Sequence, residues 1–382
     1  MKQKLLFVNA SLQIGGVEKS LCDILRNIDP QKYDVYLYLD EAGAFFPEIE
    51  DLITRVEPNM EGCYGRFMPV AKSLITSRNY RALLLRFTRS MKGKIEIVMS
   101  HLLRKIYQRS YGSFDCVIAF REGFYSSFAL KCFSARKYIC WWHGSNPPDR
   151  NELSKYEDTY RFKHIVAVSH STAEMIKNYL PNIDGVVTIP NMINNKDISQ
   201  KARVSPYIGN IFRIVSVGRL APEKHFENIV PAAKALLEVD YDFIWHIVGE
   251  GPERAKLEQL IAENNLENCI ILEGGKTNPY PYMKYADLFV HPSYVESQGL
   301  TVLEAMALGV PCVVTKSLGP CEFIEDGVNG LLTEQSPESL TEKVLEILND
   351  KALYQRIKEN TKCPEQFMPD TVMKQIENLF DG

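Results

Sequence analysis

The sequence predicts an α/β protein made of two doubly wound, parallel-sheet domains. Short apolar runs of strand length alternate with segments of helical periodicity along the chain, which is typical of parallel sheets flanked by helices. At 382 residues the chain is too long for one ordinary core, so two domains are expected. Residues 196–210 lose this periodicity. We therefore expect a first domain over 1–198, a linker over 199–210, a second domain over 211–365 and, over 366–382, a C-terminal helix that returns to the first domain.

The individual strands are predicted by short runs rich in branched apolar residues. They read KLLFVNA, YDVYLYL, CVIAF, KYIC and HIVAVS in the first half, and FRIVSVGR, FIWHIVGEG, CIILEG, DLFVHPS, PCVVT and GLLT in the second. The first helix is predicted by apolar side chains at helical spacing, namely Val17, Leu21, Ile24, Leu25 and Ile28. Two doubly wound domains place ligands at the carboxyl ends of their strands.

Composition and cysteine usage narrow the class of protein. The net charge is −4, which gives no general reason to expect nucleic acid as a partner. Nine cysteines without any C-x-x-C pair are expected to be free thiols, mostly buried, in a reducing cytoplasm. The N-terminal run MKQKLLFVNASLQIGG is predicted as a first strand rather than a signal peptide, and no apolar stretch is long enough to span a membrane.

Two strand ends in the second half carry residues suited to phosphate. In VGRLAPEK a strand ends at Gly218, and Arg219 and Lys224 then flank a turn. A planar guanidinium and a point charge together suit a diphosphate, although a solvated turn is the alternative. In VGEGPE, Gly249 follows another strand, where glycine lets a backbone approach a ligand or simply forms a tight turn.

The stretch YVESQGLTVLEAMALGVP places Glu296 and Glu304 on either side of Gly299. On one continuous helix the two carboxylates would lie about 80° apart around the axis and ~12 Å apart along it. We instead predict a loop up to Gly299 and a helix beginning near Leu300, whose free amide groups form a phosphate site. Because like charges repel, the two glutamates are expected to accept hydrogen bonds from sugar hydroxyls beside the phosphate.

The order of these motifs carries a resemblance. The succession GRLAPEK, VGEGPE, DLFVHPSYVESQGLTVLEAMALGVPCVVT and EFIEDGVNGLL resembles family 4 of the retaining glycosyltransferases, in which two Rossmann-like domains of the GT-B fold face a central cleft. Glu296 and Glu304 match the E-x7-E motif of that family. The first half matches more thinly, at Gly15-Gly16-Val17-Glu18, Trp142-His143-Gly144, Val168-Ser169 and Pro190-Asn191.

The resemblance implies a role for each matching residue. Arg219 and Lys224 would hold the donor diphosphate, Glu304 the nucleotide ribose, and Glu296 the hydroxyls of the donor sugar. The remaining donor contacts would come from Gly218, Gly249, Gln298, Gly299, Leu300 and Thr301, and from Gly16 and His143 of the first domain. Gln298 departs from the family, which more often has an aromatic residue there, and this bears on the identity of the donor sugar. The implied enzyme retains anomeric configuration, needs no metal or cofactor, and uses a UDP-sugar in preference to a GDP-sugar.

A basic stretch in the first half is the other functional feature. Between Val70 and Ser110 the sequence has ten basic residues and a single acidic one, Glu96. The basic residues are Lys72, Arg78, Arg81, Arg86, Arg89, Lys92, Lys94, Arg104, Lys105 and Arg109. Apolar residues interleave with these cations in two predicted helices, which favours an anionic membrane surface; a solvated helix face is the alternative. With the resemblance, this indicates a lipid-linked saccharide acceptor, cell-surface polysaccharide synthesis (capsule, exopolysaccharide or O-antigen), and a cytoplasmic enzyme peripheral to the plasma membrane.

The same sequence gives little indication of a metal site and leaves two rival functions open. Asp240-Tyr241-Asp242 is a D-x-D triplet, but it lies before a predicted strand, at the wrong sheet edge for a crevice ligand. The histidines other than His143, which include His246 and His291, show no ligand spacing and are expected to be structural or at the surface. The rival functions are a sugar-nucleotide epimerase or hydrolase and a non-catalytic donor-binding subunit of a glycan assembly complex.

Overall fold

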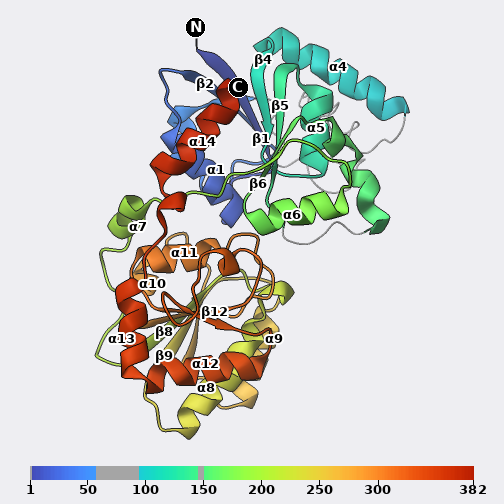
Figure 1. Cartoon of the computed structure of the whole chain (residues 1–382). Helices are drawn as coiled ribbons and strands as arrows, with labels where there is room; N and C mark the ends of the chain where they lie inside the picture. The colour runs from blue at the N-terminus through green and yellow to red at the C-terminus, as the bar shows by residue number, and fades with distance from the viewer. Residues whose placement is uncertain (1, 57–93, 145–149) are drawn as a thin grey trace, which may run out of the picture. The chain divides into compact units, whose positions relative to one another are not determined.

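A computed structural model describes residues 2–56, 94–144 and 150–382 (Figure 1). The chain forms two compact units. Unit 1 consists of Met1–Val168, Thr172–Ile189 and Met373–Gly382, and unit 2 consists of Ser169–Ser171 and Pro190–Val372. Each unit is built around its own parallel sheet, and each is described by itself below.

Unit 1 contains a parallel sheet with the strand order β3-β2-β1-β4-β5-β6-β7 in the described residues. The strands are β1 (Gln3–Asn9), β2 (Tyr33–Leu39), β3 (Thr54–Val56), β4 (Phe114–Ala119), β5 (Ala135–Trp142), β6 (His164–Ala167) and β7 (Val186–Thr188). Its α-helices are α1 (Gly16–Asn27), α4 (Lys94–Tyr111), α5 (Phe124–Cys132) and α6 (His170–Tyr179). Short 3-10 helices span Phe46–Glu48, Glu50–Leu52 and Arg150–Arg161.

The last helix of the chain, α14 (Pro369–Asp381), packs on the sheet of unit 1, where Figure 1 draws it beside β2. Its Phe380 ring meets the rings of Phe7 and Tyr33 edge to face, with centroids 6.2 Å and 5.8 Å away. The Lys137 ammonium of β5 donates a hydrogen bond to the carbonyl of Leu379. The C-terminal helix thus contacts strands β1, β2 and β5 of unit 1.

Unit 2 contains a second parallel sheet, with the strand order β10-β9-β8-β11-β12-β13. The strands are β8 (Phe212–Val217), β9 (Phe243–Val248), β10 (Ile270–Gly274), β11 (Leu288–His291), β12 (Cys312–Thr315) and β13 (Leu331–Thr333). The α-helices are α7 (Asn195–Lys201), α8 (Ile229–Glu238), α9 (Arg254–Glu263), α10 (Tyr280–Lys284), α11 (Leu300–Ala307), α12 (Pro337–Asn349) and α13 (Lys351–Asn360). Short 3-10 helices span Pro222–Lys224, Phe226–Asn228, Pro320–Glu322 and Glu365–Phe367.

The unit 2 sheet is buried on both faces, which explains its continuous apolar runs. Along β9, Trp245 and Ile247 point into a core formed with α8, α9 and α12, whereas Val248 joins a second core with α10 and α11. Alternate side chains of one strand therefore fill different layers. Apolar side chains therefore fill most positions on both faces of this sheet.

All the strand-like runs form strands, and the first helix, the helix beginning near Leu300 and the C-terminal helix form as α1, α11 and α14. Of the two helices predicted in the basic stretch, the second forms as part of α4, and the first lies outside the described residues. Two three-residue strands, β3 and β7, were not predicted, whereas β13, of the same length, was predicted from the run GLLT. The segment without periodicity also holds a helix, α7, whose Asn194 side chain caps it by accepting from the amide of Asp197. The two units divide between Ile189 and Pro190, several residues before the expected end of the first domain.

No helix among the described residues is long and apolar enough to cross a membrane. The cysteines in the described ranges are free thiols, and all of these except the exposed Cys321 are buried. Burial raises the pKa of the Cys22 and Cys116 thiols to about 12. These two thiols therefore remain protonated at neutral pH and serve as small apolar side chains.

Candidate functional site

The strand order places the switch point of unit 2 between β8 and β11. The chain builds outward from β8 to β9 and β10, and then returns to the other side of β8 with β11. The loops after β8 and β11 therefore diverge from adjacent strand ends, which is where doubly wound sheets bind ligands. Lys224 follows β8 and Glu296 follows β11, so the topology alone brings together two residues that are 72 positions apart in the sequence.

Lys224 and Glu296 form a close ion pair at this point. The Lys224 Nζ atom lies 2.6 Å from Glu296 Oε1, and the two side chains are only 19% and 14% exposed. The same oxygen lies 2.7 Å from His291 Nε2, at the end of β11. His291 was expected to be structural or at the surface. The structure places His291 in the interior rather than at the surface, with its ring against the Glu296 carboxylate.

The charge state of Glu296 follows from these contacts. Burial by itself would raise its pKa, but the charge of Lys224 and the hydrogen bond from His291 outweigh that effect and lower the pKa to about 2. Glu296 is therefore a carboxylate at any physiological pH. It can accept hydrogen bonds but cannot act as a general acid.

The loop between Glu296 and α11 is shaped by Gly299. This residue precedes the helix with φ 82°, in the left-handed region, and a Cβ there would lie 2.8 Å from the Pro320 ring. No side chain caps the helix. The amide groups of Leu300 and Thr301 lie in its first turn, where an α-helix offers no internal acceptor. The helix start predicted at Leu300 is confirmed, and these two amides can bind an anion.

The side chain of Gln298 is directed at Asn191 rather than left free. Its Oε1 accepts from the amide nitrogen and the Nδ2 of Asn191, at 2.7 Å and 2.8 Å, and its Nε2 donates to the Asn191 carbonyl at 2.9 Å. Both residues are buried. Gln298 can therefore offer a ligand its backbone, whereas its side-chain amide already holds the loop in place.

Glu304 lies inside α11 and is 4% exposed. The Tyr280 hydroxyl of α10 donates a hydrogen bond to its Oε1 at 3.1 Å. The helix thus carries Glu304 one turn beyond the free amides, as the sequence predicted. Tyr280 was not singled out from the sequence, and only its position on α10 relates it to the carboxylate.

The other cation after β8 stands apart from this pair. Arg219 is exposed, and its Nη2 lies 2.6 Å from Glu223 Oε1. The two cations predicted to work together are thus held by different carboxylates, Arg219 by Glu223 and Lys224 by Glu296. Because this contact uses only Nη2, the exposed guanidinium of Arg219 retains further N–H donors that can bind a ligand together with Lys224.

The main chain itself requires a glycine at position 249, after β9. A Cβ on Gly249 would lie 1.8 Å from the Gly218 carbonyl oxygen, and the Gly249 amide donates to the Gly274 carbonyl. Gly218 in turn donates its amide to Val248. These contacts explain Gly249 by close packing of neighbouring strand ends, independently of any ligand.

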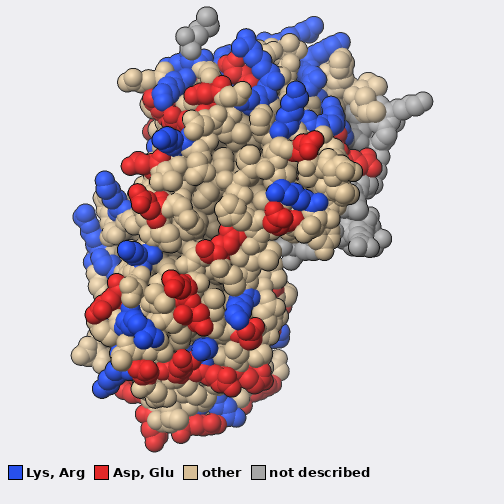
Figure 2. Space-filling model, in the orientation of Figure 1, with Lys and Arg blue, Asp and Glu red and all other residues tan. Residues whose placement is uncertain are grey.

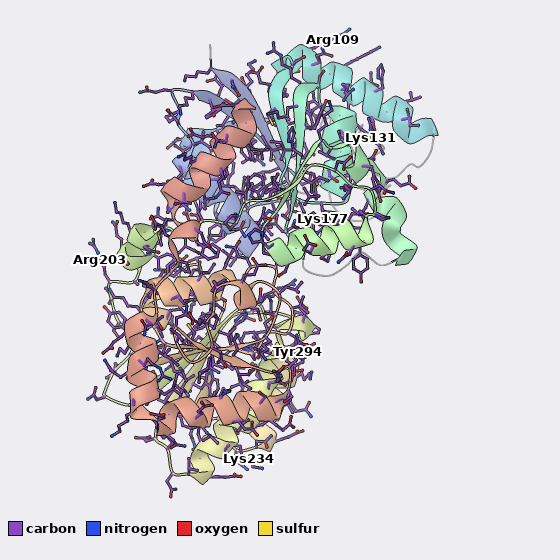
Figure 3. All side chains as sticks on the ribbon, viewed as in Figure 1. Arg109, Lys131, Lys177, Arg203, Lys234 and Tyr294 are labelled. Atoms are coloured by element: carbon purple, nitrogen blue, oxygen red, sulfur yellow. The ribbon has the colours of Figure 1, made fainter. Side chains whose placement is uncertain are left out.

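The loop beside Lys224 contains a strained residue. His225 adopts φ 48°, which is uncommon for a residue with a Cβ. Its ring stacks on Tyr294, with centroids 3.8 Å apart, and the Tyr294 hydroxyl accepts from Asn228 Nδ2. Figure 3 labels Tyr294 on the loop after β11. This stacking holds the loop after β8 against the loop after β11 and so fixes the backbone next to Lys224.

Unit 1 has its own polar cluster at the ends of β1, β4 and β5, which are neighbours in its sheet. Gly16 begins α1, and two residues on, the buried Glu18 pairs with Arg121, whose Nη2 lies 3.0 Å from Glu18 Oε1. A Cβ on Gly15 would lie 2.3 Å from Glu18 Oε2. The absence of a Cβ on Gly15 thus leaves room for the Glu18 carboxylate over the start of its own helix. Arg121 had no sequence signal beyond its place after a strand.

His143 follows β5 and is half-buried. Its backbone amide donates to Glu122 Oε2 at 3.2 Å, and its ring lies 4.8 Å from Phe120. Burial, reinforced by the charge of Arg121, lowers the pKa of His143 to about 3. Burial raises the pKa of Glu122, which the sequence analysis did not single out. His143 is therefore neutral at physiological pH and can act as a hydrogen-bond donor or acceptor.

The basic stretch falls partly outside the described residues, including Lys72, Arg78, Arg81, Arg86, Arg89 and Lys92. Within α4, Leu103 and Tyr107 are buried in the unit 1 core, and Arg104 donates to the carbonyls of Leu130 and Phe133. The opposite side exposes Ile97, Val98 and Leu102 together with Lys105 and Arg109. Figure 2 shows basic atoms over the region where α4 runs, and Figure 3 labels Arg109 at its end. One side of α4 is therefore structural and the other is an exposed basic and apolar surface.

The D-x-D triplet lies between α8 and β9, at the amino end of the strand, and Asp240 adopts φ 54°. Within the described part of the chain, no group of three or more His, Cys, Asp or Glu residues is arranged to hold a metal ion.

Comparison with solved structures identifies the fold. The chain has the GT-B fold. Anabaena HepE, solved in complex with UDP and glucose, superimposes with a TM-score of 0.75 at 21% identity, covering 100% of both chains. A variant of Staphylococcus aureus TarM, solved with fondaparinux, α-GlcNAc-glycerol and UDP, gives a TM-score of 0.74 at 15% identity, again over 100% of both chains.

Sequence comparison points to a family for the second half of the chain. Residues 197–363 match the family model described as Glycosyl transferases group 1. A poly(ribitol-phosphate) α-N-acetylglucosaminyltransferase of Staphylococcus aureus is 28% identical over 61% of this chain and 47% of its own length. An N-acetyl-α-D-glucosaminyl L-malate synthase of Bacillus anthracis is 29% identical over 56% of this chain and 58% of its own length. The matches thus span about half the length of these relatives, and the relatives are glycosyltransferases.

Proposed function

We propose that this protein is a retaining glycosyltransferase that moves a sugar from a nucleoside-diphosphate-sugar donor to a glycan or a lipid-linked saccharide. The observation that carries the proposal is the buried Lys224–Glu296 pair, 2.6 Å apart, at the switch point beside the uncapped start of α11. A cation, free helix amides and a permanently ionised carboxylate together match a diphosphate joined to a hydroxyl-rich sugar. The glycosyltransferases among its relatives support the same activity.

In the proposed reaction, the bond between the anomeric carbon and the diphosphate oxygen breaks as the acceptor oxygen bonds to the same carbon. The acceptor attacks from the face that the diphosphate leaves, and its proton passes to a phosphate oxygen of the leaving group. Positive charge develops on the sugar and negative charge on the diphosphate. Lys224, Arg219 and the amides of Leu300 and Thr301 would stabilise the leaving diphosphate more in the transition state than in the ground state.

The two glutamates would bind rather than react. Glu304, in the second turn of α11, would accept hydrogen bonds from the ribose, and Glu296 from hydroxyls of the donor sugar. From unit 1, Gly16 would approach the diphosphate and the neutral His143 would contact the sugar. Gly218, Gly249 and the backbone of Gln298 and Gly299 would complete the donor site. No resident metal or cofactor is part of this proposal.

The proposed donor nucleotide and acceptor class rest on the similar proteins and on the exposed side of α4. UDP is favoured over GDP, since both HepE and TarM have been solved with UDP. The relatives include enzymes of lipopolysaccharide core synthesis from Rhizobium meliloti, which supports an acceptor in cell-surface polysaccharide such as capsule, exopolysaccharide or O-antigen. The exposed side of α4 supports peripheral attachment to the inner face of the plasma membrane, where a polyprenyl-linked acceptor would be presented.

A thermal-shift screen tests the proposal. Wild-type protein and Glu304→Ala are heated with UDP, GDP, ADP, CMP, and UDP- and GDP-sugars. Stabilisation of wild type by one nucleoside diphosphate series, weakened in Glu304→Ala, is the expected result. Tyr280→Phe is the matched control, because it removes the hydrogen bond to Glu304 while keeping the carboxylate.

Product analysis then separates the proposed transfer from an epimerase or hydrolase activity. Incubation with the stabilising nucleotide sugar and no acceptor should leave the donor largely intact, whereas an epimerase or hydrolase would release a changed sugar nucleotide or a free sugar. A protein that no nucleotide stabilises, or that converts its donor without an acceptor, contradicts the proposal.

A further inference from the structure

His291 makes a buried hydrogen bond to the Glu296 carboxylate. His291 is the last residue of β11 and is 3% exposed. Its Nε2 lies 2.7 Å from Glu296 Oε1. Because an ionised carboxylate can only accept, the proton of this contact is on Nε2, and His291 donates it.

The two carboxylate oxygens of Glu296 differ in the hydrogen bonds that they accept. Oε1 accepts from both His291 Nε2 and Lys224 Nζ. Within the residues that the structure describes, Oε2 accepts no hydrogen bond. One oxygen is therefore held by the protein, and the other remains available for a sugar hydroxyl.

The two donors to Oε1 differ in what a ligand would do to them. Lys224 is a flexible side chain with three N–H groups, and its Nζ also lies 3.5 Å from the Val295 carbonyl. A bound diphosphate would compete with Glu296 for Lys224. His291 is nearly inaccessible and lies on a strand, so a ligand cannot draw it away. Its hydrogen bond persists when Lys224 turns toward phosphate.

We propose that His291 is a positioning residue: it holds the Glu296 carboxylate in the sugar-binding orientation while Lys224 engages the donor diphosphate. The inference rests on the proposed function of the same site. Without His291, Glu296 would depend on Lys224 alone, and the two tasks of Lys224 would conflict. With His291, the sugar contact and the phosphate contact form independently.

The same sheet offers a matched control. His246 on β9 is also buried, and its Nδ1 lies 2.8 Å from Glu273 Oε1. Glu273 accepts a further hydrogen bond from the Tyr282 hydroxyl. This second histidine–glutamate pair resembles the first in burial and distance, but β9 and β10 carry it away from the loops after β8 and β11. Replacing His246 therefore measures the purely structural cost of losing such a pair.

The test compares His291→Phe, His291→Gln and His246→Phe with wild type. Phenylalanine keeps a ring beside Phe289 but removes the donor, whereas glutamine retains an N–H at the reach of Nε2. Melting temperature, donor KM and kcat are measured with the nucleotide sugar found in the thermal-shift screen. His291→Phe should lower kcat/KM for the donor by roughly tenfold to a hundredfold, the range expected for a hydrogen bond to a charged group. His291→Gln should recover most of this loss, and His246→Phe should keep wild-type kinetics.

A readout without substrate keeps the inference testable if a variant fails to fold. In the 15N NMR spectrum of histidine-labelled wild type, the His291 ring should show a proton on Nε2, and its Nε2 resonance should shift in Glu296→Gln. Wild-type kinetics in a folded His291→Phe, or an unchanged resonance in Glu296→Gln, would overturn the positioning role. If wild type itself binds no nucleotide sugar, the proposed function fails, whereas the resonance still reports whether His291 holds Glu296.

Discussion

Gln298 and Asn191 share three hydrogen bonds, at 2.7, 2.8 and 2.9 Å, two of which involve the main chain of Asn191. Asn191 is the second residue of the unit 2 segment that begins at Pro190, and Gln298 immediately precedes the glycine that starts α11. At position 298 the resemblance led us to expect an aromatic residue. Gln298 instead joins the loop before α11 to the start of the segment Pro190–Val372. Its direct effect is on the geometry of the loop, and the amides of Leu300 and Thr301 depend on that geometry.

Replacing Gln298 by leucine should therefore destabilise the protein. The substitution removes the hydrogen bonds that Gln298 makes to the buried amide and carbonyl of Asn191, and losing such buried hydrogen bonds costs about 1–3 kcal/mol in the free energy of unfolding. Asn191→Ala should cost less, because the two main-chain hydrogen bonds remain. Urea denaturation of both variants measures the difference. Equal stability of Gln298→Leu and wild type would show that the three contacts contribute nothing.

Lys224→Ala should lower kcat by on the order of 10² or more, because a fixed cation at the leaving diphosphate acts mainly in the transition state. Steady-state kinetics with the identified donor provide the measurement. Lys234→Ala is the matched control, since Lys234 lies exposed on α8 (Figure 3). An unchanged kcat in Lys224→Ala would rule out the leaving-group role.

Acid should remove the stability that Glu296 provides. Its folded-state pKa is lowered from 4.5 to about 2, so the carboxylate favours the folded state fully above its ordinary pKa of 4.5. This contribution is lost as the pH falls from about 4.5 to about 2. Chemical denaturation across that window should show a smaller loss of stability in Glu296→Gln than in wild type. Parallel pH profiles for the two proteins would contradict the depressed pKa.

His143 should contribute in a different pH window. Its pKa falls from 6.5 to about 3 on folding, so the unfolded chain binds a proton that the folded protein does not. The resulting contribution is complete above pH 6.5 and decreases toward pH 3, with a slope of at most about 1.4 kcal/mol per pH unit. His143→Phe should therefore lose less stability than wild type between these values. The comparison is made by urea denaturation at closely spaced pH.

The exposed side of α4 should bind anionic vesicles. Replacing Lys105 and Arg109 together by serine removes two cations beside the exposed Ile97, Val98 and Leu102. Each cation near an anionic surface contributes about 1 kcal/mol, so vesicle affinity should fall roughly tenfold or more. Flotation with phosphatidylserine-containing liposomes is the measurement.

Lys177→Ser is the control for the vesicle experiment, because Lys177 pairs with Glu174 on α6, elsewhere in unit 1 (Figure 3). Activity on a water-soluble acceptor should be unchanged in both variants. Equal flotation of the α4 variant and wild type would count against a membrane role for this surface.

Local patterns were sufficient for the elements and for part of the site. Apolar runs such as FIWHIVGEG define buried strands wherever they occur, and Gly299 followed by an Ala/Leu-rich run defines a helix start, because both signals depend on near neighbours in sequence. The fold class therefore followed from the sequence and was confirmed. The strands β3 and β7 and the helix α7 were missed, since elements this short are stabilised by the sheet or helices they pack on.

Only the tertiary structure determined which residues distant in sequence contact one another. The sequence marked Lys224 and Glu296 separately, but their common contact with His291 depends on β8 and β11 being neighbours across the switch point. The same holds for Gln298 with Asn191 and for Glu304 with Tyr280. Residue type and local spacing thus determined which side chains could bind a sugar nucleotide, whereas strand order determined which of them meet. The physical reason is that hydrogen bonds and ion pairs act over a few ångströms, and only the folded sheet brings these segments within that distance.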